Sequence, residues 1–176
     1  MRFIKLLIIS GLLLFGLITA ISLLIPFTVR ISRATNIHAS AGKIWQQVDD
    51  MHQWKEWNPF FSKLPAGAIH ISDTGAGKTT IMEVSGTTVQ WKEKKADERI
   101  VVMQGKNGKP MINGWKCIQH PGSDSTTLQW YMDFKLRWYP WEKFSSLIFD
   151  KSYGPKMEQG LDNIKKNAEA DRTSLN

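Results

Sequence analysis

Side chains that could carry acid–base or metal chemistry are few and scattered in this chain. It has four histidines among 176 residues, and they fall at expected strand ends and in loops: His38, His52, His70 and His120. None shares the i, i+4 spacing with which a helix presents two imidazoles to one metal ion. We therefore predict no metal site, and we identify no cofactor motif.

The acidic residues offer one weak candidate for a general acid or base. Glu83 faces the interior if Ile81 does. Met82 and Val84 form an equally good inner face in the opposite phase of a strand. The pair Asp49-Asp50 ends an expected helix, where exposure to solvent is the simpler interpretation. Hence we assign no catalytic residue.

One glycine-rich segment resembles the end of a phosphate-binding loop: Gly75-Ala76-Gly77-Lys78-Thr79-Thr80. In the pattern G-x-x-x-x-G-K-[ST] the first glycine would fall at position 72, which is Ser72. The segment also leads into an expected strand, whereas the motif requires a helix N-terminus to hold phosphate. We reject nucleotide binding for these two reasons.

Composition narrows the possible partners. The formal net charge is +7, but four basic residues and no acidic one lie in the first 33 positions, which leaves 19 basic and 16 acidic residues for the rest. Acidic residues are interleaved with the lysines of segment 92–98, which favours a solvated hairpin end over a nucleic-acid surface. The single cysteine, Cys117, excludes an internal disulfide and a Cys-based zinc site. We expect it to be a small buried apolar side chain.

Leu6–Ile25 is a run of 20 residues without a charge. As a helix rising about 1.5 Å per residue it would span roughly 30 Å, the hydrocarbon thickness of a bilayer. A cleaved signal peptide is the alternative, but its apolar core is shorter and ends in small residues. We predict an uncleaved single-pass anchor over residues 1–26 in the plasma (inner) membrane. Basic residues flank the run almost evenly, and the short preceding tail favours a domain on the periplasmic or extracellular side.

After residue 26 the patterns predict one domain. Residues 27–37 alternate as a half-buried strand, and a helix capped by Ser40 runs to about residue 48. A short helical element follows at residues 54–57, and turns then separate repeated β segments from residue 68 to 137.

The last β segment has the clearest alternation in the chain. Its apolar residues fall on one face and predict a long antiparallel strand with that face buried: Leu128, Trp130, Met132, Phe134, Leu136 and Trp138. Past Pro140 the period becomes helical, with a first apolar stripe of Trp141, Phe144 and Ile148. We expect Gly154-Pro155 to break or restart this helix. Gly160 lies on the later stripe, where close approach to a strand explains a glycine.

Three motifs mark this order of elements: Asn36-Ile37-His38-Ala39 leading into Lys43-Ile44-Trp45, then Trp54-Lys55-Glu56-Trp57-Asn58-Pro59, and Tyr153-Gly154-Pro155-Lys156-Met157-Glu158-Gln159-Gly160-Leu161-Asp162-Asn163-Ile164-Lys165. With them the chain resembles the START-like, Bet v 1-like superfamily, and more narrowly the membrane-anchored members of the SRPBCC, or polyketide cyclase/dehydrase-like, family. The resemblance implies an α+β helix-grip fold, in which a curved antiparallel sheet wraps a long C-terminal helix. It covers residues 27–170, ahead of a polar tail at residues 171–176.

In such a fold the resemblance implies an apolar cavity between sheet and helix. The side chains expected to bind a ligand there are Trp57, Val89, Trp91, Trp115, Trp130, Met132 and Phe134. The same residues would equally well fill a solid core. Our first hypothesis is a domain that binds a hydrophobic or amphipathic small molecule, with lipid as one candidate. A polyketide cyclase/dehydrase-type enzyme and a membrane-tethered protein-interaction module with a filled core are the alternatives, because fold does not determine function.

Aromatic residues are dense where the C-terminal helical region begins: Trp138, Tyr139, Trp141, Phe144 and Phe149. Two interpretations stay open for them. They pack in the core, or some of them rest at a lipid interface, where Trp and Tyr are favoured.

Overall fold

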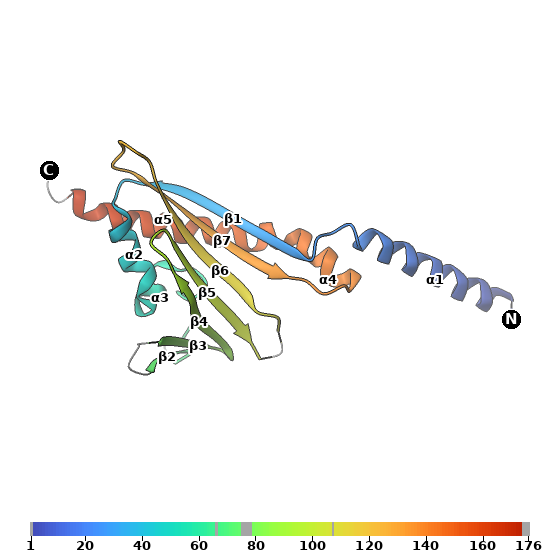
Figure 1. The fold of residues 1–176 in the computed structure, drawn as a ribbon. Coiled ribbons are helices and arrows are strands. Elements are labelled where there is room, and N and C mark those ends of the chain that lie inside the picture. Colours follow the sequence, from blue (N-terminus) through green and yellow to red (C-terminus); the bar gives the residue numbers. More distant parts are fainter. Residues whose placement is uncertain (1, 66, 75–78, 107, 174–176) are drawn as a thin grey trace.

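The computed structural model describes residues 2–65, 67–74, 79–106 and 108–173, in which a curved sheet packs on a long helix and a further helix projects from one end (Figure 1). The helical elements are α1 (Arg2–Ser22), α2 (Ala41–Asp49), η1 (Met51–Gln53), α3 (Trp54–Trp57), α4 (Pro140–Ser145), η2 (Ser146–Ile148) and α5 (Phe149–Thr173). The strands are β1 (Thr28–Ile37), β2 (Ile69–Thr74), β3 (Thr79–Val84), β4 (Thr87–Lys94), β5 (Glu98–Gly105), β6 (Met111–Gln119) and β7 (Thr126–Lys135). The predicted helix-grip fold is confirmed. Gly75 to Lys78 of the glycine-rich segment, and residues 174–176 of the expected tail, lie outside the described residues.

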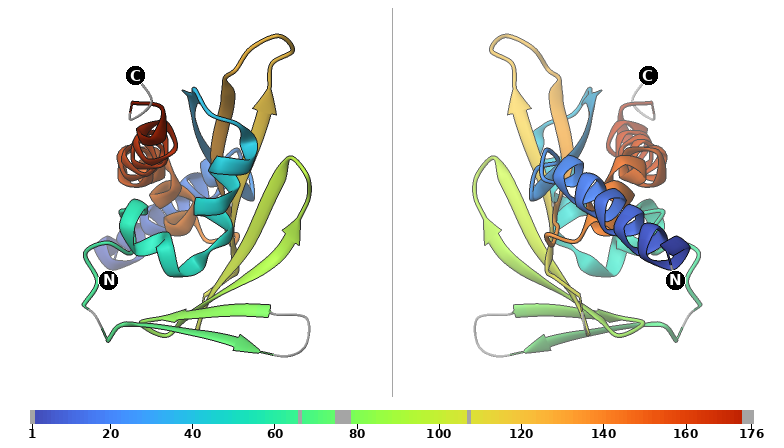
Figure 2. Two further views of the ribbon diagram at one scale, coloured as in Figure 1. Left: turned by 90° about the vertical axis from the view of Figure 1, so that its left-hand side faces the viewer. Right: turned by 90° about the vertical axis from the view of Figure 1, so that its right-hand side faces the viewer.

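All seven strands form one antiparallel sheet in the order β1-β7-β6-β5-β4-β3-β2. Strands β2 to β7 are a meander, and β1 closes onto β7 from Thr28↔Lys135 to Ile37↔Thr126. A register shift between Trp91 and Glu93 marks a bulge in β4, and a bulge increases the local twist. Figure 2 shows α2, α3 and α5 together on the concave face of this sheet. These helices and the sheet therefore enclose the interior of the domain (Figure 2).

Helix α1 is long and apolar enough to cross a membrane. It has 21 residues. An 18-residue stretch of it has a mean hydropathy of 2.4, and no residue of this stretch is buried against the rest of the protein. The helix ends at Ser22, three residues before the predicted end at Ile25. The hydroxyls of Thr19 and Ser22 donate to backbone oxygens about one turn back, and Pro26 disfavours a helical residue before it. Residues 23–25 form a turn instead.

Strand β7 confirms most of the predicted alternation. Leu128, Trp130 and Met132 are buried on the concave face. The strand ends at Lys135, however, so the prediction that Trp138 continues the buried face is wrong. Trp138 lies beyond the last ladder pair and is 56% exposed. Because Trp138 is outside the strand, the alternation of β7 does not determine where its side chain points.

Helix α5 runs without a break from Phe149 to Thr173, so the expected interruption at Gly154-Pro155 is wrong. Packing against the sheet compensates for the hydrogen bond that Pro155 cannot donate. A Cβ at position 154 would meet the guanidinium of Arg33 on β1, which would have to shift. Gly160 confirms the predicted close approach, since its Cβ would lie 2.6 Å from Trp130 Cζ3.

The short helix α4 and the η2 turn bury a side that carries polar residues. Pro140, Lys143 and Ser146 are buried at spacings of three. Trp141 and Ile148 of the predicted apolar stripe are exposed, and Phe144 is half-buried. Most of the stripe therefore lies on the outer side of these elements, and core packing, one of the two interpretations left open, does not hold for Trp141.

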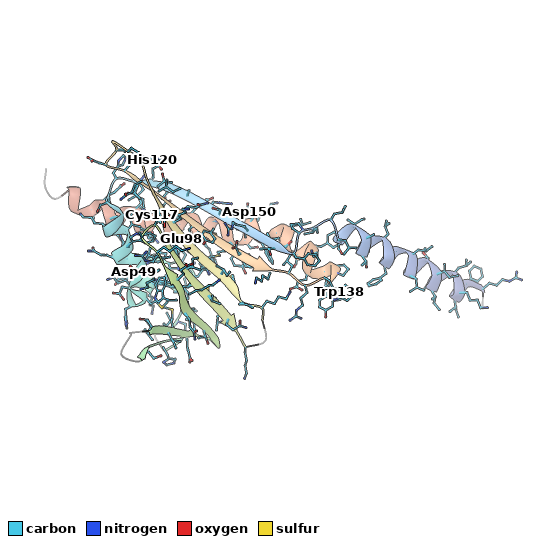
Figure 3. All side chains as sticks on the ribbon, in the orientation of Figure 1. Asp49, Glu98, Cys117, His120, Trp138 and Asp150 are labelled. Atoms are coloured by element: carbon cyan, nitrogen blue, oxygen red, sulfur yellow. The ribbon has the colours of Figure 1, made fainter. Side chains whose placement is uncertain are left out.

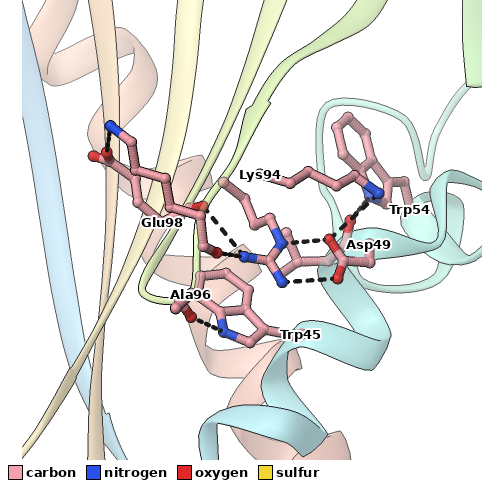
Figure 4. Close-up of polar contacts among 9 residues, drawn as sticks. Trp45, Asp49, Trp54, Lys94, Ala96 and Glu98 are labelled. Atoms are coloured by element: carbon pink, nitrogen blue, oxygen red, sulfur yellow. Dashed lines mark hydrogen bonds and ion pairs between the residues drawn. The ribbon is translucent and has the colours of Figure 1, made fainter. Parts of the chain in front are cut away.

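Helix α2 is joined to the sheet by a salt bridge of Asp49, whose side chain is half-buried (Figure 4). Arg99 donates from Nε and Nη2 to the two carboxylate oxygens of Asp49 at 2.7 and 3.2 Å. The same guanidinium lies 4.3 Å from the ring centroid of Trp45, whose Nε1 donates to the Ala96 carbonyl at 3.2 Å. Asp50 accepts a hydrogen bond from the backbone of His52 and caps η1. Both aspartates therefore have structural roles.

Candidate ligand-binding cavity

Aromatic rings occupy most of the space between the sheet and α5. Trp115 and Trp130 are cross-strand partners, and their rings stack with centroids 5.5 Å apart. Trp57 of α3 and Phe60 of the following loop pack edge-on against Trp130, with centroids at 5.8 and 6.0 Å. Trp54 lies 5.3 Å from Trp115. These contacts join the helices to the sheet through one continuous aromatic layer.

A small cavity is left within this layer. Its volume is about 50 Å³, and the residues that line it are Trp54, Asn58, Phe60, Phe61, Met103, Met111, Asn113, Trp115, Trp130, Met132 and Tyr153. Such a volume has room for a few water molecules, each of which requires roughly 10–15 Å³. Pockets for drug-sized ligands are larger, at about 300 Å³ or more. The cavity in this structure is therefore too small for a drug-sized ligand.

Three of the seven residues predicted to bind a ligand line this cavity: Trp115, Trp130 and Met132. Trp57 and Val89 are buried in the surrounding core, and Trp91 and Phe134 are half-buried against it. The sequence did contain a signal for two lining residues that we missed. Met111 and Asn113 share the period-2 face of Trp115 on β6.

The other missed residues come from the α3 region, the loop after it, β5 and α5: Trp54, Asn58, Phe60, Phe61, Met103 and Tyr153. Phe60 and Phe61 directly follow the Trp54–Pro59 motif, but only the folded loop brings them to the cavity. Tyr153 reaches it from α5, where its ring lies 5.9 Å from that of Phe60. Phe60, Met103, Met111 and Tyr153 are only half-buried, so this side of the cavity lies nearest to the surface.

Polar groups in the cavity wall are few, and one of them lacks a partner. Trp130 Nε1 donates to Asn113 Oδ1 at 3.2 Å, and Asn113 Nδ2 donates to Met103 Sδ at 2.8 Å. Asn58, also buried, accepts from the backbone of Phe60 at 3.1 Å. Trp115 is 1% exposed, and its Nε1 has no hydrogen-bond partner among the described residues. A buried donor without a partner costs roughly 1–3 kcal/mol. Trp91 Nε1, outside the cavity lining, is a second unpaired buried indole donor.

The titratable groups do not converge on the cavity. Tyr153 is the only lining residue with an ionisable side chain. Glu83 is exposed while Met82 and Val84 are buried, which resolves the phase of β3. Figure 3 shows Asp49, Glu98, His120 and Asp150 spread over the domain. Among the described residues, no group of three His, Cys, Asp or Glu side chains could hold a metal ion.

Two groups outside the cavity have pKa values raised by burial. Cys117 is buried as predicted, and burial raises the pKa of its thiol from 9.0 to about 12. Burial also raises the pKa of the Tyr131 phenol on the convex face, where Tyr131 donates to Glu98 Oε1 at 2.9 Å. Gly114 on the neighbouring strand leaves room for this phenol. Both residues are structural and stay protonated at neutral pH.

A second hollow is an open polar groove of about 750 Å³ at the end of the domain remote from α1. Its walls are His38, Ala39, Ser40, Lys43, Gln119, His120, Pro121, Ser123, Asp124, Ser125, Thr126 and Ala168. Its polar groups already bond to protein, since His120 Nε2 is 2.8 Å from Thr127 Oγ1 and Thr126 Oγ1 donates to the Ala39 carbonyl at 2.9 Å. Its shape and polarity are those of a solvated surface groove.

A family model described as polyketide cyclase / dehydrase and lipid transport matches residues 28–169. The chain belongs to this family. The match begins at the first residue of β1 and ends within α5, so it covers the sheet and the helices packed on it. No curated protein sequence matches the chain.

Solved structures share the fold at low sequence identity. The Zhui aromatase/cyclase from Streptomyces sp. R1128 superposes with a TM-score of 0.59 at 15% identity, over 81% of this chain and 94% of that one. A START superfamily protein from Mycobacterium smegmatis gives 0.55 at 18% identity, over 80% and 97%. Norcoclaurine synthase from Thalictrum flavum gives 0.54 at 18% identity, over 82% and 96%. At these identities the likeness establishes the fold, and the ligand must be argued from the residues of this chain.

Proposed function

We propose that this protein is a membrane-anchored domain that binds a hydrophobic or amphipathic small molecule in the aromatic cavity. The observation that carries the proposal is an apolar cavity walled in part by the stacked rings of Trp115 and Trp130. The buried Nε1 of Trp115, which has no partner among the described residues, adds a hydrogen-bond donor in one of these rings. A ligand with a flat apolar part and one hydrogen-bond acceptor would stack on Trp115 and Trp130 and accept this hydrogen. Binding would draw on apolar burial worth about 25 cal/mol per Å², before the entropy of association is subtracted.

The cavity must enlarge to admit such a molecule. Met103 and Met111 are unbranched side chains that change shape at little cost, and Phe60 lies on a loop. These residues and Tyr153 are half-buried, so their movement would open the cavity to the outside without disturbing the sheet. We infer that the ligand enters on this side.

The lining supports binding over catalysis. Acid–base catalysis needs positioned groups within hydrogen-bond reach of the reacting atoms. The amides of Asn58 and Asn113 are engaged with the protein, and Tyr153 is the one ionisable group in the wall. An enzyme of cyclase/dehydrase type is the second candidate, favoured by the family description. Turnover of an aromatic polyketide by the purified chain would replace the first proposal with this one.

We further propose that α1 anchors the chain as a single span in the plasma (inner) membrane. The anchor would comprise residues 1–26 and the domain residues 27–170, with the domain on the periplasmic or extracellular side. Support comes from the length of α1, its mean hydropathy of 2.4 and the exposure of its apolar side chains.

Native mass spectrometry of the full chain, purified from its own host in detergent, tests ligand binding. We expect a reproducible added mass that survives removal of detergent. Met111→Trp, which adds a ring at the half-buried side of the cavity, should reduce the bound fraction at least fivefold. Ile118→Trp is the matched control, because Ile118 is exposed on the same strand and lies outside the cavity.

The control also separates cavity binding from lipid held around α1. Equal occupancy in wild type and both variants would assign the mass to α1 and contradict a cavity ligand. Absence of any added mass in the wild type would favour the protein-interaction module with a filled core.

A further inference from the structure

Exposed apolar side chains gather where α1 joins the domain. Four of them, which we call the juxta-anchor patch, are 56 to 65% exposed: Trp138, Trp141, Leu147 and Ile148. The connector between α1 and β1 adds Leu23, Leu24 and Phe27, which are 57 to 83% exposed. Large exposed apolar patches mark surfaces that contact a partner or a membrane. Figure 3 shows Trp138 at this end of the domain, remote from His120.

Three of the four patch residues lie on α4 and η2, where polar side chains face the core and apolar side chains face outward. Along α4 and η2 the buried positions include Lys143 and Ser146, whereas Trp141, Leu147 and Ile148 face outward. A helix on a water-facing surface has the opposite arrangement, with its apolar stripe toward the core. This orientation is stable when the outer side of the helix meets an apolar medium.

Lys143 holds the patch beside the end of α1. Its side chain is fully buried, and Nζ donates to the backbone oxygen of Ile25 in the connector. Nζ also lies 3.6 Å from the ring centroid of Phe27. Within the described part of the chain, Lys143 has no carboxylate at ion-pair distance, so its charge is used to join α4 to the connector. Helices α1 and α4 are in contact as a result.

The surroundings of the patch are basic. Lys135, Arg137 and Lys151 are exposed. The nearby acid groups are engaged: Glu142 accepts from the backbone of Arg137 at 3.0 Å, and Asp150 pairs with Arg33 at 2.9 Å. Free basic side chains next to Trp and Tyr match the headgroup region of a membrane, where phosphates lie above the acyl chains.

We propose that the juxta-anchor patch docks on the bilayer that holds α1, at the boundary between headgroups and acyl chains. The inference rests on the proposed anchoring by α1 and adds a second membrane contact that fixes the orientation of the domain. Phe149 follows the patch directly, and Phe134 lies 4.8 Å from Phe149 and 4.9 Å from Tyr153. A row of aromatic rings therefore leads from the docked surface to the cavity, and an apolar ligand would reach the cavity from the membrane.

Spin labelling of the full chain in phosphatidylcholine/phosphatidylglycerol nanodiscs tests the docking. A nitroxide on Leu147→Cys should collide with lipid-soluble oxygen at least threefold more, relative to an aqueous nickel complex, than a nitroxide on Gln119→Cys. Gln119 is exposed at the end of β6 remote from α1. Cys117 is buried and its thiol pKa is raised, so the native cysteine should not take the label. Trp138→Ser with Trp141→Ser should reduce the oxygen preference at position 147 at least twofold.

Alkaline extraction of the cell membranes from which the full chain is purified separates failure of docking from failure of anchoring. Equal, water-like accessibility at positions 147 and 119 in a chain that resists extraction would overturn the docking and leave the anchor intact. A chain that is released by extraction would overturn the anchor, and with it the docking that depends on it.

Discussion

At several positions in this domain, tight packing rather than a reactive role determines which residue is present. Trp130 can stack on Trp115 and still touch α5 only because position 160 has no Cβ. The same relation holds on the convex face, where Gly114 accommodates Tyr131. Three buried polar atoms have no partner in the described protein: Gln47 Oε1, Trp91 Nε1 and Trp115 Nε1. Of these three residues, only Trp115 lines the cavity.

Gly160→Ala should destabilise the domain by about 1–2 kcal/mol. Overpacking against Trp130 costs about 1–3 kcal/mol, and the higher helix propensity of Ala returns up to about 1 kcal/mol. Gly42→Ala is the matched control in α2, where the nearest atom to the new Cβ is Ser40 Oγ at 3.9 Å. The control should be stabilised by up to about 1 kcal/mol. Urea unfolding of the full chain in detergent measures both, and equal effects at the two positions would contradict the close approach.

Alkaline pH should destabilise the domain through Cys117. The folded pKa is raised from 9.0 to about 12, so above pH 9 the unfolded chain releases a proton that the folded chain keeps. The free energy of unfolding should fall between pH 9 and about 12, by at most about 1.4 kcal/mol per pH unit from this group. Cys117→Ala should have a shallower decline in urea midpoints over pH 8 to 11. An identical decline in both proteins would show that the thiol is not protected.

Predictions for single residues were correct where the repeat of apolar residues along the chain matches the face that is buried. Alternation along β7 placed Trp130 and Met132 on the concave face, and the lone cysteine was correctly expected to be buried. It missed the salt bridge of Asp49, because the partner Arg99 lies 50 residues away in the chain. It could not find Phe60 and Tyr153, which meet only through the folded loop and α5.

At the scale of elements, tertiary contacts override local rules in two places. Pro155 and Gly154 would end an isolated helix, yet α5 continues because its residues are held against β1 and the concave face of the sheet. The α4 helix has a recognisable apolar period, but the period cannot say whether lipid or protein covers it. In both places the spacing of the apolar residues indicates a helix, but it does not show what surrounds that helix.

The link between α2 and the sheet should be the most sensitive polar contact between elements. Asp49→Asn weakens two charge-assisted hydrogen bonds from Arg99, which is only 13% exposed, and should destabilise the domain by about 1–3 kcal/mol. Lys116→Gln is the control, because its contact with Asp97 is 3.8 Å long and exposed. It should change stability by less than about 0.5 kcal/mol in the same urea experiment. A larger effect for the control would show that Arg99 and Asp49 are not a structural pair.

For the whole molecule, the fold was predictable and the ligand was not. Solved structures whose names denote different activities share this fold. This chain combines a nearly filled aromatic interior with an exposed apolar patch beside α1. The first follows from its content of eight tryptophans, and the second from the burial of Lys143 against the connector.

The proposed topology places the domain outside the cytoplasm. A membrane-impermeant maleimide should label Gln119→Cys in intact cells, and it should label it in inside-out vesicles only after detergent is added. The reason is that the exposed end of β6 lies on the domain, on the far side from α1. Labelling confined to inside-out vesicles would place the domain in the cytoplasm.

The tryptophan indole resonances of the ¹⁵N-labelled full chain test the central claim most directly. Trp115→Phe identifies the Trp115 signal among those of the eight tryptophans. Removing the co-purified molecule by delipidation, and then restoring it with a host lipid extract, should move the Trp115 Nε1–H resonance reversibly. The resonance of Trp54, whose Nε1 donates to the Val48 carbonyl at 2.8 Å, should move much less. A Trp115 signal that stays fixed through both steps would contradict a ligand in this cavity.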